Sequence, residues 1–398
     1  MHQCGLCKKT SLINVIDLGE TPIAHEFSTT KEQALARQKH PMSLLVCDAC
    51  GMGQLAEVID PRILYSEYNF CFSSWKKQPH IEDECHKLTR YLSSGTIVEV
   101  GCNDGLFLSE IAQYGDFKCI GIEPNKVTSA LARDKGFEVI NKFFDQAIVN
   151  ELSGRKVDVL FARQVMEHIP NVENFLVSVN QLLDIGGYIG IEVPNTEIAL
   201  KTGDVSCLWE EHVNYFTPSS LKVALQGTGF KVVEQATYQF SGEAVFMLAV
   251  KESHSKSFGI NSSEDISLYL GYESLVNEYK TLLKAKILHF KKQGYEIALY
   301  GSGCRSSMIY HGLSLSEEID LIIDDQKEKQ GLFMSASELA IQSLASLPQD
   351  KKYLFILSVN HENDAIVSKH ILARCFNEVK IVSAHSPVNI INEIKCLT

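Results

Sequence analysis

Long apolar runs are missing from this sequence. No stretch reaches the roughly 18 consecutive apolar residues that a membrane-spanning helix needs. The first residues, Met1–Cys7, also lack the basic and apolar regions of a secretory signal peptide. We therefore expect a cytoplasmic protein that does not enter membranes.

Basic residues are scarce relative to acidic ones. The chain has 37 lysines and arginines against 49 aspartates and glutamates, for a formal net charge of −12. A chain of this charge is not a natural ligand for the phosphates of nucleic acid or anionic lipid, and we expect neither as a partner. Its 398 residues are enough for two or three domains.

The twelve cysteines divide into two groups. Eight occur singly, as buried thiols usually do, and the other four form two Cys-x-x-Cys pairs, made by Cys4, Cys7, Cys47 and Cys50. A reducing compartment favours thiols over disulfides, and four thiolates suit a closed, structural Zn²⁺ site. Unmetallated thiols and a redox pair are the alternatives.

A strand followed by a glycine turn and a helix is predicted around residues 97–111. Ile97–Val100 is rich in apolar residues, Gly101 and Gly105 bracket the turn, and apolar residues then recur at helical spacing. The order acid-x-Gly-x-x-x-Gly, from Glu99, is neither the dinucleotide fingerprint nor the Lys-ended phosphate loop. A ligand without phosphates is therefore favoured. Glu123 ends the next strand, where a carboxylate can accept both ribose hydroxyls.

These two stretches look like the first two strands of a class I S-adenosylmethionine-dependent methyltransferase, an α/β fold with a Rossmann-like parallel sheet. Further strands at 158–162 and 187–194 follow at the spacing of its fourth and fifth strands. The alternative is a similar turn with an incidental acid at the strand end. The resemblance implies that the methyl donor is bound by Glu99, Gly101, Asn103, Asp104, Gly105, Glu123 and Gln164.

Side chains that could take part in catalysis are concentrated in residues 208–217. His212 stands among acids, aromatics and an amide, after the fifth strand and at the open end of the sheet. An imidazole titrates near neutrality, and the neighbouring carboxylate of Glu211 would raise its basicity and fix its tautomer. A structural hydrogen-bonding histidine is the alternative. Arg163, Gln164 and His168 follow the fourth strand, which places them near the methyl donor.

Two other segments allow more than one interpretation. The aromatic residues at 65–75, among them Tyr68 and Phe72, either fill a core or form a lid over a flat ligand. Residues 253–263 are expected to be a linker. The apolar positions between 266 and 290 predict one or two long amphipathic helices, which either form a dimer surface or pack against a second α/β unit.

That second unit is predicted from the strand 295–300, which runs into Gly301-Ser302-Gly303, and from a following strand that ends at Asp324. The turn could belong to a dinucleotide site, although the third glycine is absent. It could instead receive a pyrophosphate on its amides and Arg305, or be purely structural.

Four landmarks in order resemble the nucleotide-sugar C-methyltransferases that act on 4-keto deoxyhexoses, such as those of the tetronitrose pathway. They are the paired cysteines, the turn 99–105, Glu211-His212-x-x-Tyr215-Phe216, and the turn 300–305 with Asp324 to Gly331. The resemblance covers essentially the whole chain. It implies a small N-terminal zinc-binding domain (1–75), a central methyltransferase domain (76–252) and a C-terminal Rossmann-like α/β domain for the nucleotide (253–398).

The resemblance also implies a mechanism and a set of substrate contacts. His212, with Glu211 beside it, would remove the C3 proton that the C4 ketone acidifies, and the enolate carbon would attack the sulfonium methyl. The C-terminal domain would hold the nucleotide diphosphate of the linked sugar. The substrate contacts we expect are Tyr68, Phe72, His168, Asn195, Tyr215, Glu243, Arg305, Lys329 and Asn360.

Three departures from the family pattern concern the lining of the active site. Trp209 stands where the tetronitrose-type enzyme has a tyrosine, Gln164 replaces a smaller amide, and Phe240-Ser241-Gly242 replaces a His-Gly-Gly turn. An O- or N-methyltransferase with the same three domains is therefore one alternative function. A zinc-ribbon binding protein with a vestigial methyltransferase core is another. The assembly is expected to be a monomer or a homodimer.

Overall fold

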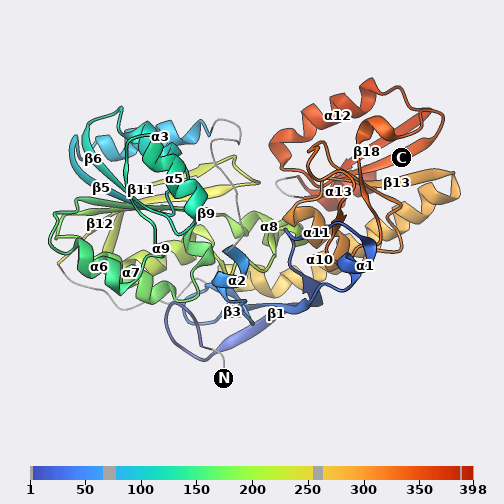
Figure 1. Ribbon diagram of the computed structural model, residues 1–398. Coiled ribbons are helices and arrows are strands. Elements are labelled where there is room, and N and C mark those ends of the chain that lie inside the picture. The colour runs from blue at the N-terminus through green and yellow to red at the C-terminus, as the bar shows by residue number, and fades with distance from the viewer. Residues whose placement is uncertain (1–2, 66–77, 254–262, 386–387, 398) are drawn as a thin grey trace.

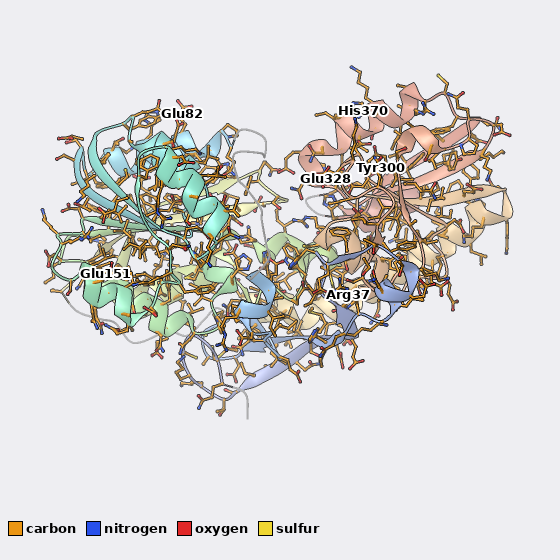
Figure 2. All side chains as sticks on the ribbon, viewed as in Figure 1. Arg37, Glu82, Glu151, Tyr300, Glu328 and His370 are labelled. Carbon is orange, nitrogen blue, oxygen red and sulfur yellow. The ribbon has the colours of Figure 1, made fainter. Side chains whose placement is uncertain are left out.

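The computed structural model describes residues 3–65, 78–253, 263–385 and 388–397. Figure 1 shows two α/β lobes side by side, with the N-terminal strands below and between them. In Figure 2, Glu82 and Glu151 mark opposite edges of the central lobe, and His370 lies on the outer surface of the C-terminal lobe. No helix of these described residues is both long enough and apolar enough to cross a bilayer.

The N-terminal sheet has four strands in the order β1-β3-β4-β10. Three come from the start of the chain: β1 (Leu12–Pro22), β3 (Lys39–Cys47) and β4 (Gly53–Leu55). The fourth, β10 (Asn214–Tyr215), lies within the stretch that the sequence assigns to the methyltransferase domain. It pairs antiparallel with β4, so the chain that follows His212 is hydrogen-bonded to the N-terminal sheet.

The central sheet has seven strands in the order β11-β12-β9-β8-β5-β6-β7. The strands from β9 to β7 are parallel, whereas β12 runs antiparallel to both β9 and β11. The bounds are β5 Ser94–Val100, β6 Asp116–Ile122, β7 Glu138–Ile140, β8 Val159–Arg163, β9 Tyr188–Pro194, β11 Phe230–Tyr238 and β12 Ala244–Lys251. The four strands expected from apolar runs are confirmed as β5, β6, β8 and β9.

Helices cover both faces of this sheet (Figure 1). Apolar residues such as Val98 and Ile97 are fully buried although they point to opposite faces, which explains the continuous apolar runs. The helices are α3 His80–Thr89, α4 Leu106–Ile111, α5 Lys126–Asp134, α6 Gln146–Leu152, α7 Val172–Leu182, α8 Thr196–Thr202 and α9 Pro218–Gly227, with the short turns η2 Met166–His168 and η3 Val205–Cys207.

The C-terminal sheet is parallel throughout, in the order β16-β14-β13-β17-β18. Its strands are β13 Tyr295–Tyr300, β14 Leu321–Ile323, β16 Ile341–Gln342, β17 Lys352–Leu357 and β18 Glu378–Ser383, and its helices are α11 Cys304–Gly312, α12 Asp364–Ala373 and α13 Ile390–Cys396. A small ladder between β2 (Phe27–Ser28) and β15 (Phe333–Met334) joins it to the N-terminal part. The other short helices of the described residues are α1 Lys31–Leu35, α2 Pro61–Tyr65, η4 Leu344–Ser346 and η5 His361–Asn363.

The predicted amphipathic region is one helix, α10 (Ser263–Lys292). It packs against the N-terminal sheet, the C-terminal sheet and helix α8 of the central domain. Its buried tyrosines donate hydrogen bonds to distant carbonyls: Tyr269 to Tyr215 (3.0 Å), Tyr272 to Asp204 (2.7 Å) and Tyr279 to Ala384 (2.8 Å). The same face belongs to a core shared with β1, β3 and β13. The expected packing against the second α/β unit is therefore what the structure shows.

Candidate functional site

The four paired cysteines converge at one end of the N-terminal sheet. The Sγ atoms of Cys4 and Cys50 are 3.5 Å apart, as are those of Cys7 and Cys47, and all four lie within 4.8 Å of one another. Four sulfurs around Zn²⁺ at about 2.3 Å lie roughly 3.8 Å from each other. The donor set therefore fits a zinc ion and leaves no coordination position open.

The turn between β5 and α4 has the backbone shape that the sequence predicts. Gly101 has a φ of +70°, and a Cβ there would lie 2.5 Å from Val165 Cγ2, so glycine is required. Asn103 and Gly105 also have positive φ, of +49° and +75°. The amide of Asn103 donates to Glu123 Oε2 at 2.9 Å, which fastens the turn to the end of β6.

Glu123 has acceptor capacity left for a ligand. Its Oε1 accepts from the amide of Asn125 at 2.8 Å and its Oε2 from that of Asn103, and each oxygen has a further lone pair. Burial raises the pKa of this carboxyl above its usual value. The arrangement fits the two ribose hydroxyls of S-adenosylmethionine, at the carboxyl edge of the sheet.

Glu99 and Asp104 lie deeper than the ligand-facing part of the turn. Glu99 is 3% exposed, and burial raises the pKa of its carboxyl to about 8. Asp104 is 1% exposed and lies 3.6 Å from the ammonium of Lys135. Direct contact of either carboxylate with the methyl donor stays a prediction.

Arg163 is part of a buried ionic network. Its guanidinium lies 2.6 Å from Glu84 Oε2 and 3.0 Å from Glu192 Oε2, on the side of the sheet that α3 covers. Glu192 Oε1 accepts from the amide of Gln164 at 2.6 Å. Arg163 therefore holds Glu192, which in turn orients Gln164, whose φ of +53° places it in the exit turn of β8.

His212 lies in the loop between η3 and β10, in contact with two other rings. Its ring centroid is 3.8 Å from that of Trp209 and 4.9 Å from that of His168. Burial first, and then the nearby His168 and Arg305, lower the pKa of His212 well below its usual value. The imidazole is therefore neutral near pH 7, which is the form that accepts a proton.

His168 is oriented by a backbone carbonyl. Its Nδ1 lies 2.8 Å from the carbonyl oxygen of Glu211, which only accepts hydrogen bonds, so Nδ1 carries the hydrogen. Glu167 Oε1 lies 3.9 Å from Nε2 of His168. The structure thus brings His168, at the end of η2, next to His212.

The side chain of Glu211 does not pair with His212. The expectation that this carboxylate orients the His212 imidazole is therefore wrong. Its carboxylate forms an ion pair with Nδ1 of His25, a residue between β1 and β2. Burial lowers the pKa of His25, but the pairing with Glu211 outweighs it and the net shift is upward. Glu210 accepts from the amide of Ala24 at 2.9 Å. His25 was missed because it is 186 residues away from Glu211, and its position in Pro22-Ile-Ala-His25-Glu was the available signal.

A small cavity of about 30 Å³ lies beside His212. This volume holds about one or two water molecules and is too small for a hexose, so its walls must move apart to admit one. The amide of Asn195 donates to Glu243 Oε1 at 2.5 Å, and the Tyr215 hydroxyl donates to the carbonyl of Trp209 at 3.4 Å. Three expected substrate contacts, Asn195, Tyr215 and Glu243, thus line one cavity with His212.

Arg305 lines the same cavity from the C-terminal lobe. Its guanidinium donates to Ser206 Oγ at 3.0 Å and to the carbonyl of Ser241, and it lies 4.0 Å from Asp204. The expectation of an arginine facing a diphosphate at its own turn is therefore not what the structure shows. Helix α11 directs this side chain across to the central lobe.

The other expected substrate contacts are more dispersed. Lys329 lies 3.4 Å from Asp324 and 5.3 Å from the centre of the Phe27 ring. Asn360 precedes η5, beyond the carboxyl end of β17. Tyr68 and Phe72 lie outside the described residues, as does most of the proposed aromatic lid.

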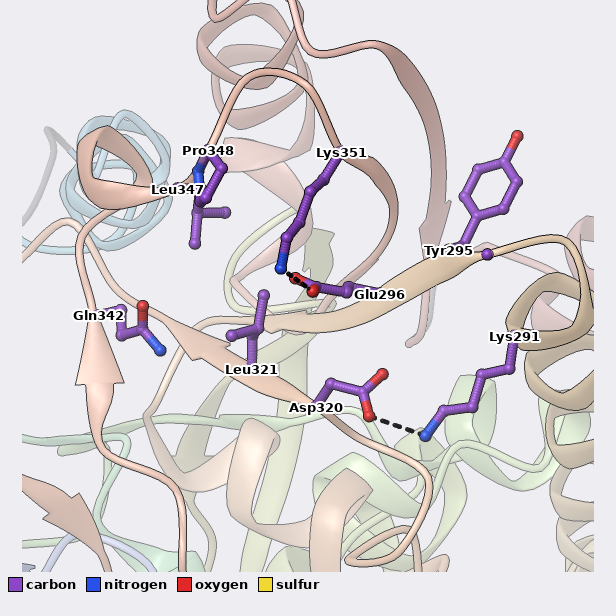
Figure 3. A pocket seen from close by; sticks show the side chains of 10 residues that line it. Lys291, Tyr295, Glu296, Asp320, Leu321, Gln342, Leu347, Pro348 and Lys351 are labelled. Atoms are coloured by element: carbon purple, nitrogen blue, oxygen red, sulfur yellow. Dashed lines mark hydrogen bonds and ion pairs between the residues drawn. The ribbon is translucent and has the colours of Figure 1, made fainter.

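A larger pocket of about 580 Å³ lies at the amino ends of β13 and β14 (Figure 3). The charged side chains drawn there pair with one another, Lys291 with Asp320 and Lys351 with Glu296. This edge of the sheet is opposite to the one where open α/β sheets bind ligands, and it contains none of the expected site residues.

Three family models match successive parts of the chain. They are described as "Putative zinc binding domain" (residues 4–65), "Methyltransferase domain" (residues 75–235) and "C-methyltransferase C-terminal domain" (residues 242–376). The chain is an S-adenosylmethionine-dependent methyltransferase. It has the three-part organisation of the C-methyltransferases, as the resemblance implied.

This methyltransferase is similar to curated proteins of two kinds. It is 23% identical to C-methyltransferase NovU of Streptomyces niveus, over 92% of this chain and 91% of that one. It is 24% identical to a ubiquinone biosynthesis O-methyltransferase of Azorhizobium caulinodans, over 38% of this chain and 64% of that one. Among solved structures, a SAM-dependent methyltransferase from Archaeoglobus fulgidus is 17% identical with a TM-score of 0.36, over 48% of this chain and 100% of that one.

Proposed function

We propose that this methyltransferase transfers a methyl group to carbon, next to the ketone of a nucleotide-linked 4-keto deoxysugar, with His212 as the general base. The observation that carries the proposal is a buried, neutral imidazole in a cavity that the central and C-terminal lobes share. The full-length similarity to a C-methyltransferase, which includes the C-terminal part, supports carbon as the acceptor.

The residues of this chain divide the work of the reaction. S-adenosylmethionine, when bound, supplies an electrophilic methyl group on a sulfonium. Gly101 and Gly105 have no side chain, so the donor can approach the backbone there, and Glu123 accepts hydrogen bonds from the ribose hydroxyls of the donor. His212 takes the C3 proton of the sugar, while Trp209 and His168 fix the plane of its ring. Asn195, Tyr215 and Glu243 supply polar groups around the sugar.

A panel of 4-keto nucleotide sugars is first screened for one that the wild type methylates. The activity of His212→Asn is then assayed on that sugar. Turnover should fall about 10²–10⁴-fold, the usual contribution of a positioned base, while calorimetry shows an unchanged donor affinity. Because the His212 pKa is lowered, the wild-type rate should fall with decreasing pH only below the usual imidazole range. His86→Ala, an exposed histidine on α3, is the matched control. Wild-type turnover in His212→Asn would contradict the proposal.

Product NMR separates this function from O-methylation, which the similarity to ubiquinone O-methyltransferases over the central domain favours as the second candidate. A new methyl singlet on a quaternary sugar carbon supports C-methylation. A methoxy signal would establish the second candidate instead.

We also propose that Cys4, Cys7, Cys47 and Cys50 hold a structural Zn²⁺. Metal analysis should find one zinc per chain, and Cys47→Ser should lose it together with several degrees of melting temperature. Cys375→Ser, at an exposed single cysteine, should keep both. Unchanged zinc content in Cys47→Ser would rule out this ligand set.

A further inference from the structure

An enolate needs hydrogen-bond donors at its oxygen, and the residue beside His212 does not offer a phenol. Trp209 occupies that position, and its ring packs against the imidazole with a centroid separation of 3.8 Å. Removing one such donor from an active site typically costs a factor of about 10²–10³ in rate. Trp209 has an indole N–H but is not among the residues that line the cavity beside His212, so another group there must supply this contact if C3 is to be deprotonated.

Most side-chain amides and hydroxyls in the cavity already donate to protein acceptors. Asn214 uses its amide for the carbonyls of Met166 (3.2 Å) and Ile169 (2.7 Å), Asn195 donates to Glu243, and Tyr215 donates to Trp209. These donors are engaged in holding the site together.

Arg305 differs from them in both charge and capacity. Among the residues of the described chain that line this cavity, it is the one arginine or lysine. A guanidinium has five N–H donors, and the contacts to Ser206 and Ser241 use two of them. The guanidinium carbon of Arg305 lies over the Trp209 ring, 6.0 Å from its centre. The positive charge is therefore close to the indole that stands where a tyrosine was expected.

We propose that Arg305 is a catalytic residue that stabilises the enolate, rather than a ligand of the nucleotide diphosphate. His212 takes the proton from C3, and the C–H electron pair moves into a C3–C4 double bond while the C4 oxygen gains a negative charge that faces Arg305. The enolate carbon then takes the methyl group from the sulfonium, whose C–S bond breaks with its electron pair left on sulfur, and the C4 ketone is restored. This inference rests on the proposed C-methylation.

The test is exchange of the C3 proton with D₂O, followed by NMR without any methyl donor, on the 4-keto nucleotide sugar that the wild type methylates. Arg305→Gln should slow exchange at saturating sugar about 10²–10³-fold and change the sugar Kd less than threefold. Arg305→Lys, which keeps the charge, should slow it about tenfold, and millimolar guanidine should restore part of the exchange in Arg305→Gln. If Arg305→Gln does not fold, the Arg305→Lys exchange rate decides.

Three outcomes would overturn the inference. Wild-type exchange with a sugar affinity weakened tenfold or more would make Arg305 a diphosphate ligand. Equal loss of exchange in Ser206→Ala, which removes a neighbouring contact but keeps the guanidinium, would reduce Arg305 to a contact between the lobes. His212→Asn keeps the two proposals separable, because loss of exchange there supports the base whatever Arg305 does. A wild type that methylates oxygen would overturn both.

Discussion

The glycine turns of the central sheet and of the C-terminal sheet stand in the same order of strand, turn and helix, but the acids that follow them accept different hydrogen bonds. In each, a parallel strand enters a glycine turn, a helix follows, and the acid that ends the next strand accepts an amide of the turn. Glu123 accepts from Asn103 at 2.9 Å, and Asp324 accepts from Ser302 at 3.0 Å.

The two acids differ in what else they bind. Glu123 has backbone amides on its oxygens, whereas Asp324 also accepts from the Ser302 hydroxyl at 2.6 Å and from the amide of Gln326, and it lies 3.4 Å from the Lys329 ammonium. Each oxygen of Glu123 accepts one backbone amide, so both can still receive a ligand hydroxyl. Asp324 Oδ2 already accepts two bonds and faces the Lys329 ammonium, so only its Oδ1 has an acceptor position left. An acid after a glycine turn therefore indicates a ribose site only when its acceptors remain available.

Substituting the acid that follows each turn should give the largest effect, on the affinity for S-adenosylmethionine. Glu123→Ala removes the acceptor for two hydroxyls and should weaken S-adenosylmethionine binding about 10–100-fold, or roughly 1.4–2.8 kcal/mol. Asp324→Asn, the matched change in the other turn, should leave this affinity within about twofold. Calorimetry measures both, and equal losses would show that the two turns are not functionally distinct.

A smaller effect concerns the backbone of the two turns. Gly105 has a φ of +75°, and a Cβ would lie 3.2 Å from Ala132 Cβ, so Gly105→Ala should cost about 1–2 kcal/mol of unfolding free energy. Gly303 has a φ of −86° with nothing within 4 Å of a built Cβ, so Gly303→Ala should change it by less than about 0.5 kcal/mol. Denaturant titrations give both values. A costly Gly303→Ala would mean that this position needs glycine as Gly301 does, whose φ is +116°.

The smallest effect is on the pH dependence of donor affinity. Burial raises the pKa of Glu123, so this carboxylate should become protonated, and lose an acceptor, at a higher pH than an ordinary glutamate. As the pH is lowered, the affinity should therefore begin to weaken at a higher pH than it would with an ordinary glutamate. Glu123→Gln should bind more weakly but with a flat profile, and a sloping profile in that variant would assign the titration to another group.

The central fold could be predicted because its signals are local. Buried parallel strands are apolar on both faces, and glycines at positive φ leave a recognisable spacing, so β5, β6, β8 and β9 and the turn at 101–105 follow from short stretches of sequence. Each Cys-x-x-Cys pair was also predictable, because it needs only a tight turn, whereas the meeting of the two pairs depends on how residues 8–46 fold.

The site was harder to predict because its partners come from distant parts of the chain. Glu211 is adjacent to His212 in sequence, yet its carboxylate pairs with His25. Arg305 follows a glycine turn that predicts a local phosphate contact, yet it reaches Ser206 and Ser241. Both contacts depend on how separately folded regions dock, and no local pattern records that.

The pairing of β10 with β4 has a consequence for how the enzyme responds to chemical stress. Strand β4 begins just after Cys50, and β10 begins just after His212, so the thiol cluster and the proposed base are attached to neighbouring strands of one sheet. Oxidation of the cysteines, or removal of a metal ion bound to them, would therefore displace the proposed base. Neither the methyl-donor site nor the sugar site would itself be modified. Chimeras between relatives should accordingly exchange β4 and β10 together.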